Sequence, residues 1–306
     1  MGYNATVVIT TKDRKEDLRR ALKSAISQTP SVEVLVIDDG SSDGTEDMVR
    51  SKFPTVRVVR SEQSLGLIVQ RNRAAQLATA PIVFSIDDDA EFSTPNVVAQ
   101  TLAEFDHSKV GAVAIPFVDV YRKVEYGLNL PDHDNIYVDH IYIGTAHAVR
   151  VDLFQRLGGY REVLYHQGEE DDFCARLLDA GYFVRCGHAD LIYHYVSPKR
   201  DLTKIAYFGA RNAVLFAWAN VPMPYFIIHL AGTCLINLAA SVRNNSLRPT
   251  LKGLMRGYLD SFGKHVERRP ISERTYRLFR KMRKMGPMKL TDLEQSLNIA
   301  DTAGLI

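Results

Sequence analysis

Residues 82–89, Ile-Val-Phe-Ser-Ile-Asp-Asp-Asp, form a run of apolar and β-branched residues that ends in three carboxylates. Such a run is typical of a buried strand, and its polar end marks the point where the strand leaves the core. Working outward, we predict further strands at 5–10, 32–37, 56–59 and 110–116, separated by helices at 15–28, after 43, at 67–77 and at 97–105. This alternation predicts an α/β fold, in which helices cover both faces of a mostly parallel sheet.

The carboxylates of Asp87, Asp88 and Asp89 follow the predicted strand without a break. Adjacent like charges repel, so a cation among them would stabilise such a cluster. Carboxylate oxygens are hard ligands, and Mg²⁺ or Mn²⁺ shared with a substrate diphosphate is the expected occupant. The alternative is a solvated acidic turn.

A second pair of carboxylates, Asp38-Asp39, ends the strand predicted at 32–37 and leads into the turn Gly40-Ser41-Ser42. Ligands of open α/β sheets bind at this edge. We therefore expect the carboxylate of Asp39 to accept hydrogen bonds from a nucleobase or a ribose. A capped turn between strand and helix is the alternative.

Four acids open a predicted helix in the segment Gly168-Glu169-Glu170-Asp171-Asp172. Acids at a helix start interact favourably with the helix dipole, which explains some of them but not four. A carboxylate crowded by others has a raised pKa, and a general base that works near neutral pH needs such a pKa.

A histidine, His194, follows a short predicted strand and precedes Ser197, Lys199 and Arg200, with the pair Arg211-Asn212 further on. The basic and hydroxyl side chains favour a patch that binds a diphosphate. A histidine with a purely structural role is the alternative.

Taken in this order and spacing, the four motifs resemble the inverting glycosyltransferases of family two, over roughly residues 5 to 215. The resemblance implies the GT-A fold, a Rossmann-like, mostly parallel sheet flanked by helices. It also implies transfer of a sugar from a nucleotide diphosphate-sugar donor to an acceptor hydroxyl. The likeness to bacterial polysaccharide and rhamnosyl transferases implies a role in the synthesis of cell-surface polysaccharide or glycolipid.

The resemblance assigns a role to each candidate site residue. Thr10, Asp39, Arg71, Asp87 and Asp88 are expected to contact the nucleotide, Asp89 and His194 to bind the divalent cation, and Glu169, Asp172, Ser197 and Arg200 to contact the diphosphate or the acceptor.

The catalytic base is expected to be Glu170. Gly168, Glu169, Asp172 and Arg176 match the family pattern Gly-Glu-Asp-x-Asp-Leu-x-x-Arg, in which Glu170 stands at the position of the catalytic Asp. Asp171 is the alternative base, although sliding the frame by one residue loses most of the matches. The implied mechanism is a single displacement that inverts the anomeric carbon.

The charge of the chain is segregated. Its 38 Lys and Arg residues against 36 Asp and Glu residues give a net charge of +2, so we do not expect it to bind nucleic acid. Residues 243–284 alone hold 13 basic and 3 acidic residues. A basic, partly apolar segment suits an anionic membrane surface, where a lipid-linked acceptor would be found. The alternatives are a basic helix packed on the catalytic domain and a contact within a homo-oligomer.

We predict two regions, a nucleotide-sugar-binding and catalytic domain at 1–215 and a helical, basic region at 216–306. The longest apolar stretch, 225–242, contains His229, Thr233 and Asn237, each costly in hydrocarbon, so an interfacial or soluble helix is expected rather than a membrane-spanning one.

Two observations bear on location. The three cysteines lack metal-ligand spacing, which favours a reducing compartment, and the first residues lack the pattern of a signal peptide. We therefore expect a cytoplasmic protein, peripheral on the inner face of the plasma membrane.

Other classes of protein fit less well. A dehydrogenase would have a glycine-rich turn after the first strand, and residues 10–14 contain no glycine. The remaining alternative is a nucleotide- or carbohydrate-binding relative without turnover, which the glutamate at the base position suggests.

Overall fold

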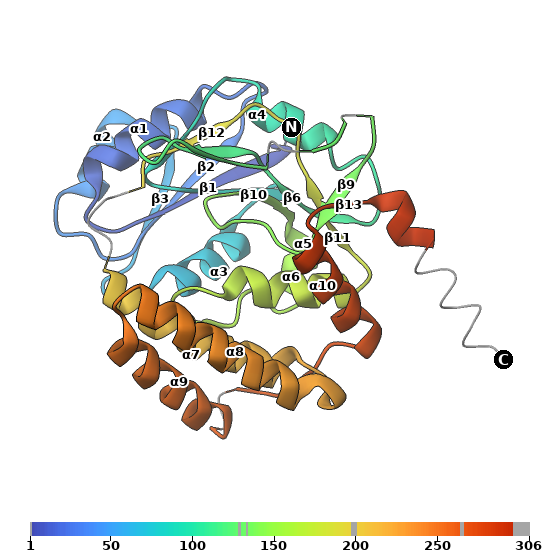
Figure 1. The fold of residues 1–306 in the computed structure, drawn as a ribbon. Helices are drawn as coiled ribbons and strands as arrows, with labels where there is room; N and C mark the ends of the chain where they lie inside the picture. Colours follow the sequence, from blue (N-terminus) through green and yellow to red (C-terminus); the bar gives the residue numbers. More distant parts are fainter. Residues whose placement is uncertain (1, 128–129, 133, 197–200, 264–265, 296–306) are drawn as a thin grey trace.

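A computed structural model of the chain describes residues 2–127, 130–132, 134–196, 201–263 and 266–295. Its centre is a nine-stranded sheet with helices on both faces (Figure 1). The strands lie in the order β13 (Met288–Lys289), β9 (Tyr137–Asp139), β11 (Phe183–Cys186), β6 (Val110–Ala114), β10 (Ala146–Arg150), β4 (Ile82–Asp87), β1 (Ala5–Thr11), β2 (Glu33–Asp38) and β3 (Arg57–Arg60).

The predicted α/β class is confirmed, but only half of the sheet is parallel throughout. β4, β1, β2 and β3 run parallel to one another, as their alternation with helices requires. β10 lies antiparallel between β4 and β6, and β9 is antiparallel to both β11 and β13. The strand β10 follows a loop rather than a helix, and the sequence pattern did not predict it.

Each face of the sheet has its own hydrophobic core. On one face lie α1 (Lys15–Ile26), α2 (Thr45–Lys52) and α4 (Val97–Ala103), and on the other lie α3 (Leu67–Leu77), α5 (Val151–Arg156), the 3₁₀ turn η1 (Glu162–Leu164) and α6 (Glu169–Asp179) (Figure 1). The buried residues of α1, Leu18, Ala21, Leu22 and Ala25, recur at the three- and four-residue spacing that turns one helical face toward the sheet.

A smaller sheet lies beside the carboxyl end of β4. Its strands are ordered β5 (Ala90–Phe92), β12 (Ile192–His194), β7 (Phe117–Asp119) and β8 (Val124–Tyr126). β5 follows β4 after two residues, so the antiparallel pairing of β12 with β5 brings the distant His194 opposite Ala90. The strands β8 and β9 both lie in the segment 121–141, where the sequence analysis predicted no strand.

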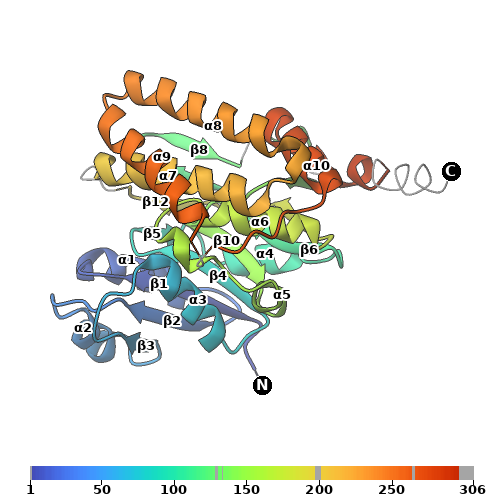
Figure 2. The same ribbon diagram turned by 90° about the horizontal axis from the view of Figure 1, so that it is seen from below.

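The rest of the described chain is mainly helical: α7 (Leu202–Asn220), α8 (Met223–Arg243), α9 (Leu247–Ser261) and α10 (Glu273–Met285). These helices form a layer against α6 and η1, on the side away from β2 and β3 (Figure 2). The expected domain boundary after residue 215 falls inside α7, and β13 from the C-terminal region extends the central sheet. The C-terminal region therefore shares a helix and the central sheet with the catalytic fold.

Three prolines of this region lie at the starts of helices. Pro222 is the N-cap of α8, Pro224 lies in its first turn, and Pro249 lies in the first turn of α9. A proline is tolerated there because the first amide groups of a helix have no intrahelical partner.

Helix α8 is long and apolar enough to cross a membrane, and 6% of its most apolar window is buried inside the protein. It packs on α7 and α9 and exposes a row of large apolar side chains to solvent: Met223, Ile227, Ile228, Leu235, Ile236 and Val242.

The three cysteines are free thiols. Cys174 and Cys186 are buried, whereas Cys234 on α8 is half-buried.

Candidate active site

The polar residues of the first and fourth strands meet at one edge of the central sheet. β1 and β4 are parallel neighbours, and their register sets Thr10 opposite Asp87. Two parallel neighbours end at the same edge of a sheet, so the residues that follow them are brought together. The aspartate cluster lies at this edge, next to the start of the smaller sheet.

A group of two carboxylates and one imidazole lies at the end of β4. Ligand atoms of Asp87, Asp89 and His194 all lie within 4.8 Å of one another. The Nε2 atom of His194 is 3.2 Å from Oδ1 of Asp89 and 3.8 Å from Oδ2 of Asp87, and this buried nitrogen has no hydrogen-bond partner among the described residues. An orphaned nitrogen between two carboxylates fits a divalent ion such as Mn²⁺, which accepts both ligand types.

Asp88 points away from this group. Its carboxylate accepts a hydrogen bond of 2.7 Å from Thr11 Oγ1 and lies 3.0 Å from an Nη atom of Arg14. Burial raises the pKa of Asp88 to about 7 against the opposing effect of Arg14. The expected contact of Asp88 with a nucleotide is therefore not supported, since its side chain is 7% exposed and already partnered.

The sequence analysis missed Arg14. Its guanidinium lies 3.0 Å from both Asp88 and Asp89 and holds the two carboxylates in place. No pattern at residues 10–14 indicates this role, because Arg14 lies more than 70 residues from its partners along the chain.

Arg71 connects the group of Asp87, Asp89 and His194 to the start of α6. It is buried on α3, and one Nη atom is 2.8 Å from Asp87 while the other is 3.2 Å from Glu169 and 3.6 Å from Glu170. The arginine expected to contact the nucleotide thus lies among three of the carboxylates that the sequence motifs singled out.

The start of α6 holds the candidate base. Burial, then the negative charge of Glu169, raise the pKa of Glu170 above its usual range, and Arg71 opposes this shift. Burial likewise raises the pKa of Glu169, also against Arg71. Glu169 and Glu170 therefore share a raised pKa and a contact with Arg71. Asp171 is more exposed and lies 3.9 Å from Arg283 of α10.

Gly144 makes room for this arrangement. A Cβ atom at this position would lie 2.3 Å from Oε1 of Glu170 and 2.7 Å from an Nη atom of Arg71. The backbone carbonyl of Gly144 also accepts a hydrogen bond of 3.2 Å from Arg71. A side chain here would displace both functional groups. Apart from the glycine itself, no feature of the local sequence indicates this role.

Asp172 corrects an expectation. It is buried and accepts hydrogen bonds from three side chains: Arg161, directly before η1, Arg176 on α6 and Asn220 on α7. No part of its carboxylate is left for a diphosphate or an acceptor. Asp172 instead forms ion pairs with Arg161 and Arg176, and its hydrogen bond with Asn220 joins α6 to α7.

Asp39 is also fully engaged with the protein. Its carboxylate accepts hydrogen bonds from Ser64 Oγ, Gln70 Nε2 and the amides of Leu65 and Gly66, and these donors outweigh burial and lower its pKa. Asp39 thereby fixes the loop that leads into α3. Its contact with a nucleobase stays a prediction, as does that of Thr10.

The expected diphosphate patch divides into two parts. Ser197 and Arg200 lie outside the described residues. Arg211 is buried in an ion pair of 2.7 Å with Asp260, and Asn212 donates to the carbonyls of Leu164, His166 and Gln167. The pair Arg211-Asn212 therefore holds the loop before α6, and its contact with a diphosphate stays a prediction.

Comparison with known proteins agrees with this geometry. The model of the family described as "Glycosyl transferase family 2" matches residues 6–158, half of the chain. The chain therefore belongs to glycosyl transferase family 2.

Curated relatives show partial matches. The succinoglycan biosynthesis protein ExoU of Rhizobium meliloti (strain 1021) is 31% identical over 101 residues, 32% of this chain and 29% of that protein. The pre-mycofactocin glycosyltransferase of Mycobacterium tuberculosis is 27% identical over 230 residues, 69% of this chain and 47% of that protein. The chain thus spans less than half the length of these two relatives.

Solved structures show the same fold. The mannosyltransferase PcManGT from Pyrobaculum calidifontis, in complex with GDP-Man and Mn²⁺, aligns with a TM-score of 0.56 and 21% identity over 92% of this chain and 85% of that chain. S. aureus TarS 1-349 in complex with UDP-GlcNAc aligns with a TM-score of 0.58 and 17% identity over 91% and 84%. The chain has the GT-A fold of these glycosyltransferases, as expected.

Proposed function

We propose that the protein is a glycosyltransferase that depends on a divalent cation and moves a sugar from a nucleoside diphosphate donor to an acceptor hydroxyl, with inversion of the anomeric carbon. The observation that carries the proposal is the contact of Arg71 with Asp87 on one side and with Glu169 and Glu170 on the other. It supports the proposal because the leaving diphosphate and the acceptor hydroxyl must meet at one sugar carbon.

The residues supply the chemistry as follows. Asp87, Asp89 and His194 would hold Mn²⁺ or Mg²⁺, which when bound neutralises the charge of the leaving diphosphate. The carboxylate of Glu170 accepts the proton of the acceptor hydroxyl while that oxygen attacks the anomeric carbon. The electrons of the broken carbon–oxygen bond leave with the nucleoside diphosphate. A single displacement of this kind inverts the anomeric carbon.

A thermal-shift panel of nucleoside diphosphates and nucleotide sugars, each with and without Mn²⁺, tests the donor site. The solved neighbours are complexes with GDP-Man and UDP-GlcNAc, so both guanosine and uridine compounds belong in the panel. Ligand binding to the native state raises the melting temperature. We expect a metal-dependent shift with one nucleotide, which Asp89→Ala abolishes and the exposed control Asp47→Ala retains.

Two results would contradict the proposal. If no nucleotide shifts the melting temperature with metal present, the donor site is wrong. If a nucleotide sugar binds but the protein neither hydrolyses nor transfers it, the protein is a binding relative without turnover. A product with retained configuration would refute the inverting mechanism alone.

The proposed setting is the synthesis of cell-surface polysaccharide or glycolipid, at the cytoplasmic face of the plasma membrane. The relative ExoU is named for succinoglycan biosynthesis, which supports this class of product. The exposed apolar side chains of α8 and the basic residues of α10 support a peripheral contact with anionic lipid.

A further inference from the structure

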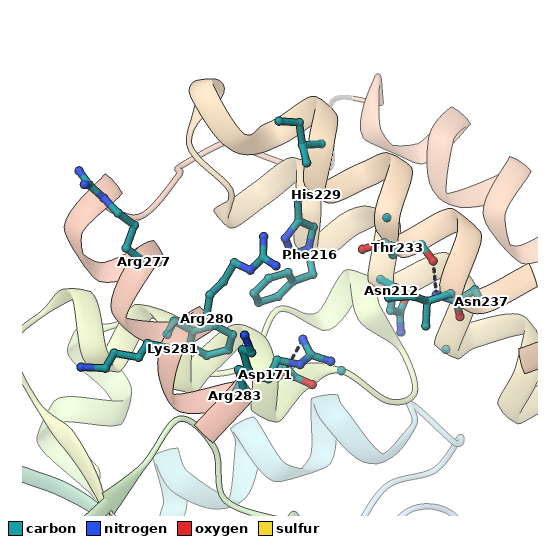
Figure 3. A pocket seen from close by; sticks show the side chains of 18 of the residues that line it. Asp171, Asn212, Phe216, His229, Thr233, Asn237, Arg277, Arg280, Lys281 and Arg283 are labelled. Carbon is teal, nitrogen blue, oxygen red and sulfur yellow. Dashed lines mark hydrogen bonds and ion pairs between the residues drawn. The ribbon is translucent and has the colours of Figure 1, made fainter. Parts of the chain in front are cut away.

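A large cavity lies between α7, α8 and α10 (Figure 3). Its volume is about 1170 Å³, which exceeds the roughly 300–1,000 Å³ that suits a small-molecule ligand. At its base lie Gln167, Gly168 and Asp171, the residues that flank Glu169 and Glu170 at the start of α6. The cavity therefore borders the start of α6 from the side of the helical layer, next to the residues on either side of Glu169 and Glu170. The group of Asp87, Asp89 and His194 lies at the sheet edge.

One wall of the cavity is cationic. Five basic residues of α10 line it: Arg277, Arg280, Lys281, Arg283 and Lys284. Asp171 is the only carboxylate among the described residues that line the cavity. Within the described part of the chain, Arg280, Lys281 and Lys284 form no ion pair with an acid. Arg280 extends toward Phe216 and His229, and Arg283 lies beside Asp171, whereas Arg277 and Lys281 point away (Figure 3).

The positive charge acts on a neighbouring group. Burial, then Arg280 and Arg283, lower the pKa of His229 to about 4, so the imidazole is neutral at physiological pH. Its Nδ1 atom lies 2.8 Å from the hydroxyl of Tyr276. Arg283 pairs with Asp171 and Arg277 with Glu273. Among the described residues no acid pairs with Arg280, Lys281 or Lys284, and an anion would balance this charge.

The opposite wall is largely apolar and comes from α8. Ile228 and Ile236 line the cavity, and these residues are 71% and 70% exposed. They continue directly into the exposed apolar face of α8, so an apolar chain in the cavity could leave along that face. His229, Thr233 and Asn237, whose polarity is unusual in this helix, lie one turn apart on the cavity side.

Gly232 leaves space in this wall. It lies in the middle of α8, and a Cβ atom there would have no heavy atom within 4 Å. A glycine inside a helix is less stable than alanine, and here no packing contact requires it. The open space is consistent with room kept for a ligand.

We propose that this cavity is the acceptor site and that it takes a saccharide carried on a lipid phosphate. The phosphate would lie against Arg280 and Arg283, the lipid chain along Ile228 and Ile236, and the sugar hydroxyl toward the start of α6. The inference rests on the proposed function, because it takes Glu170 as the group that receives the proton of that hydroxyl.

Binding of a long-chain alkyl phosphate, measured by titration calorimetry below its micelle concentration, tests the site without any nucleotide. Inorganic phosphate and an alkyl maltoside serve as the two halves of the ligand. We expect the alkyl phosphate to bind at least roughly tenfold more tightly than either half, since an ionic hydrogen bond and apolar burial both contribute.

Two double variants of α10 separate the cavity from general surface charge. Arg280→Gln with Arg283→Gln should weaken alkyl phosphate binding by roughly tenfold or more. Arg277→Gln with Lys281→Gln removes the same charge from the same helix and should leave the affinity within about twofold, because these side chains point away. Equal losses in the two variants, or equal affinity for alkyl phosphate and inorganic phosphate, would overturn the proposal.

Gly232→Trp tests the cavity by filling it. The substitution meets no atom at Cβ, so the fold should be kept, as checked by the melting temperature. We expect lost alkyl phosphate binding with an unchanged nucleotide-induced shift. Retained alkyl phosphate binding refutes the acceptor site alone, whereas a wild-type protein that binds alkyl phosphate but no nucleotide refutes the proposed function alone.

Discussion

At the scale of single residues, Arg71 organises the candidate site. It is buried, and burial alone would lower its pKa, but Asp87, Glu169 and Glu170 outweigh this and raise the pKa. The guanidinium therefore stays charged and holds three carboxylates that would otherwise repel one another. The sequence motif around Arg71 predicted a contact with the nucleotide, whereas the contacts in the structure are with the acids of two other motifs.

The two candidate bases can be separated by substitution. Glu170→Gln should lower kcat by about 10²–10⁴-fold, the usual contribution of a general base, because glutamine cannot accept the proton. Asp171→Asn should change kcat less, since Asp171 does not contact Arg71. Initial rates of sugar transfer, or of donor hydrolysis in the absence of acceptor, measure both. A larger loss for Asp171→Asn would identify Asp171 as the base.

The pH profile should report Glu170. A base acts only when deprotonated, so kcat should fall as the pH drops through the raised pKa of Glu170. Glu169→Gln removes the neighbouring negative charge that helps raise this pKa, so the acidic limb of the profile should move to lower pH. A limb that stays in place, or moves to higher pH, would show that Glu169 does not tune the base.

Gly144→Ala should damage activity more than stability. The added methyl group would push on the ends of two flexible side chains, Glu170 and Arg71, rather than on backbone. A misplacement of the base by about 1 Å can cost ~10²-fold in rate. We expect a strong loss of kcat with little change in melting temperature. A variant with full activity would show that Glu170 acts from another position.

At the scale of elements, the contact between α7 and α9 depends on small residues. Gly253 and Gly257 lie four residues apart on α9, and Thr250, Gly253, Gly257 and Ser261 form its buried stripe. The two helix backbones approach closely along this stripe, as in packing between helices that carry glycine at every fourth position. Because α7 also provides Asn212, this contact indirectly positions the loop before α6.

Two glycine substitutions should have opposite effects on stability. A Cβ atom at Gly257 would lie 2.6 Å from the backbone oxygen of Arg211, so Gly257→Ala should destabilise the protein by about 1–3 kcal/mol. Gly232→Ala has open space and should stabilise α8 by about 0.5–1 kcal/mol. Urea denaturation measures both free energies of unfolding. A stable Gly257→Ala variant would mean that α7 and α9 pack less closely than described.

At the scale of the whole molecule, apolar and basic side chains gather on the helical layer. α10 packs on the catalytic fold through Tyr276, Phe279 and Met282, and its contact with a membrane or with a second copy of the chain stays a prediction. Its other side remains basic, and α8 and α9 both expose large apolar residues nearby. Apolar surface next to positive charge is typical of proteins that contact an anionic membrane.

Vesicle cosedimentation tests this contact. Binding to anionic vesicles should fall severalfold when Ile227 and Leu235 on the outer face of α8 are changed to Ser, since each loses buried apolar area in the bilayer interface. Changing Arg277, Arg280 and Lys284 to Ala should also weaken binding, most clearly at low salt. Ile26→Ser, an exposed apolar loss on α1, is the matched control. Unchanged binding in the first two variants would refute a membrane contact through this layer.

The sequence by itself determined the parallel half of the sheet, the helices between its strands, the aspartate cluster and the family, because local periodicity and short motifs are sufficient to predict them. The tertiary structure alone decided which partners the carboxylates have: Asp89 lies beside His194, Asp88 contacts Arg14, and Asp172 is buried between arginines. It also decided that β13 completes the sheet and that α8 borders a cavity. The physical reason is that these features depend on contacts between residues far apart in the chain, and local sequence patterns do not predict such partners.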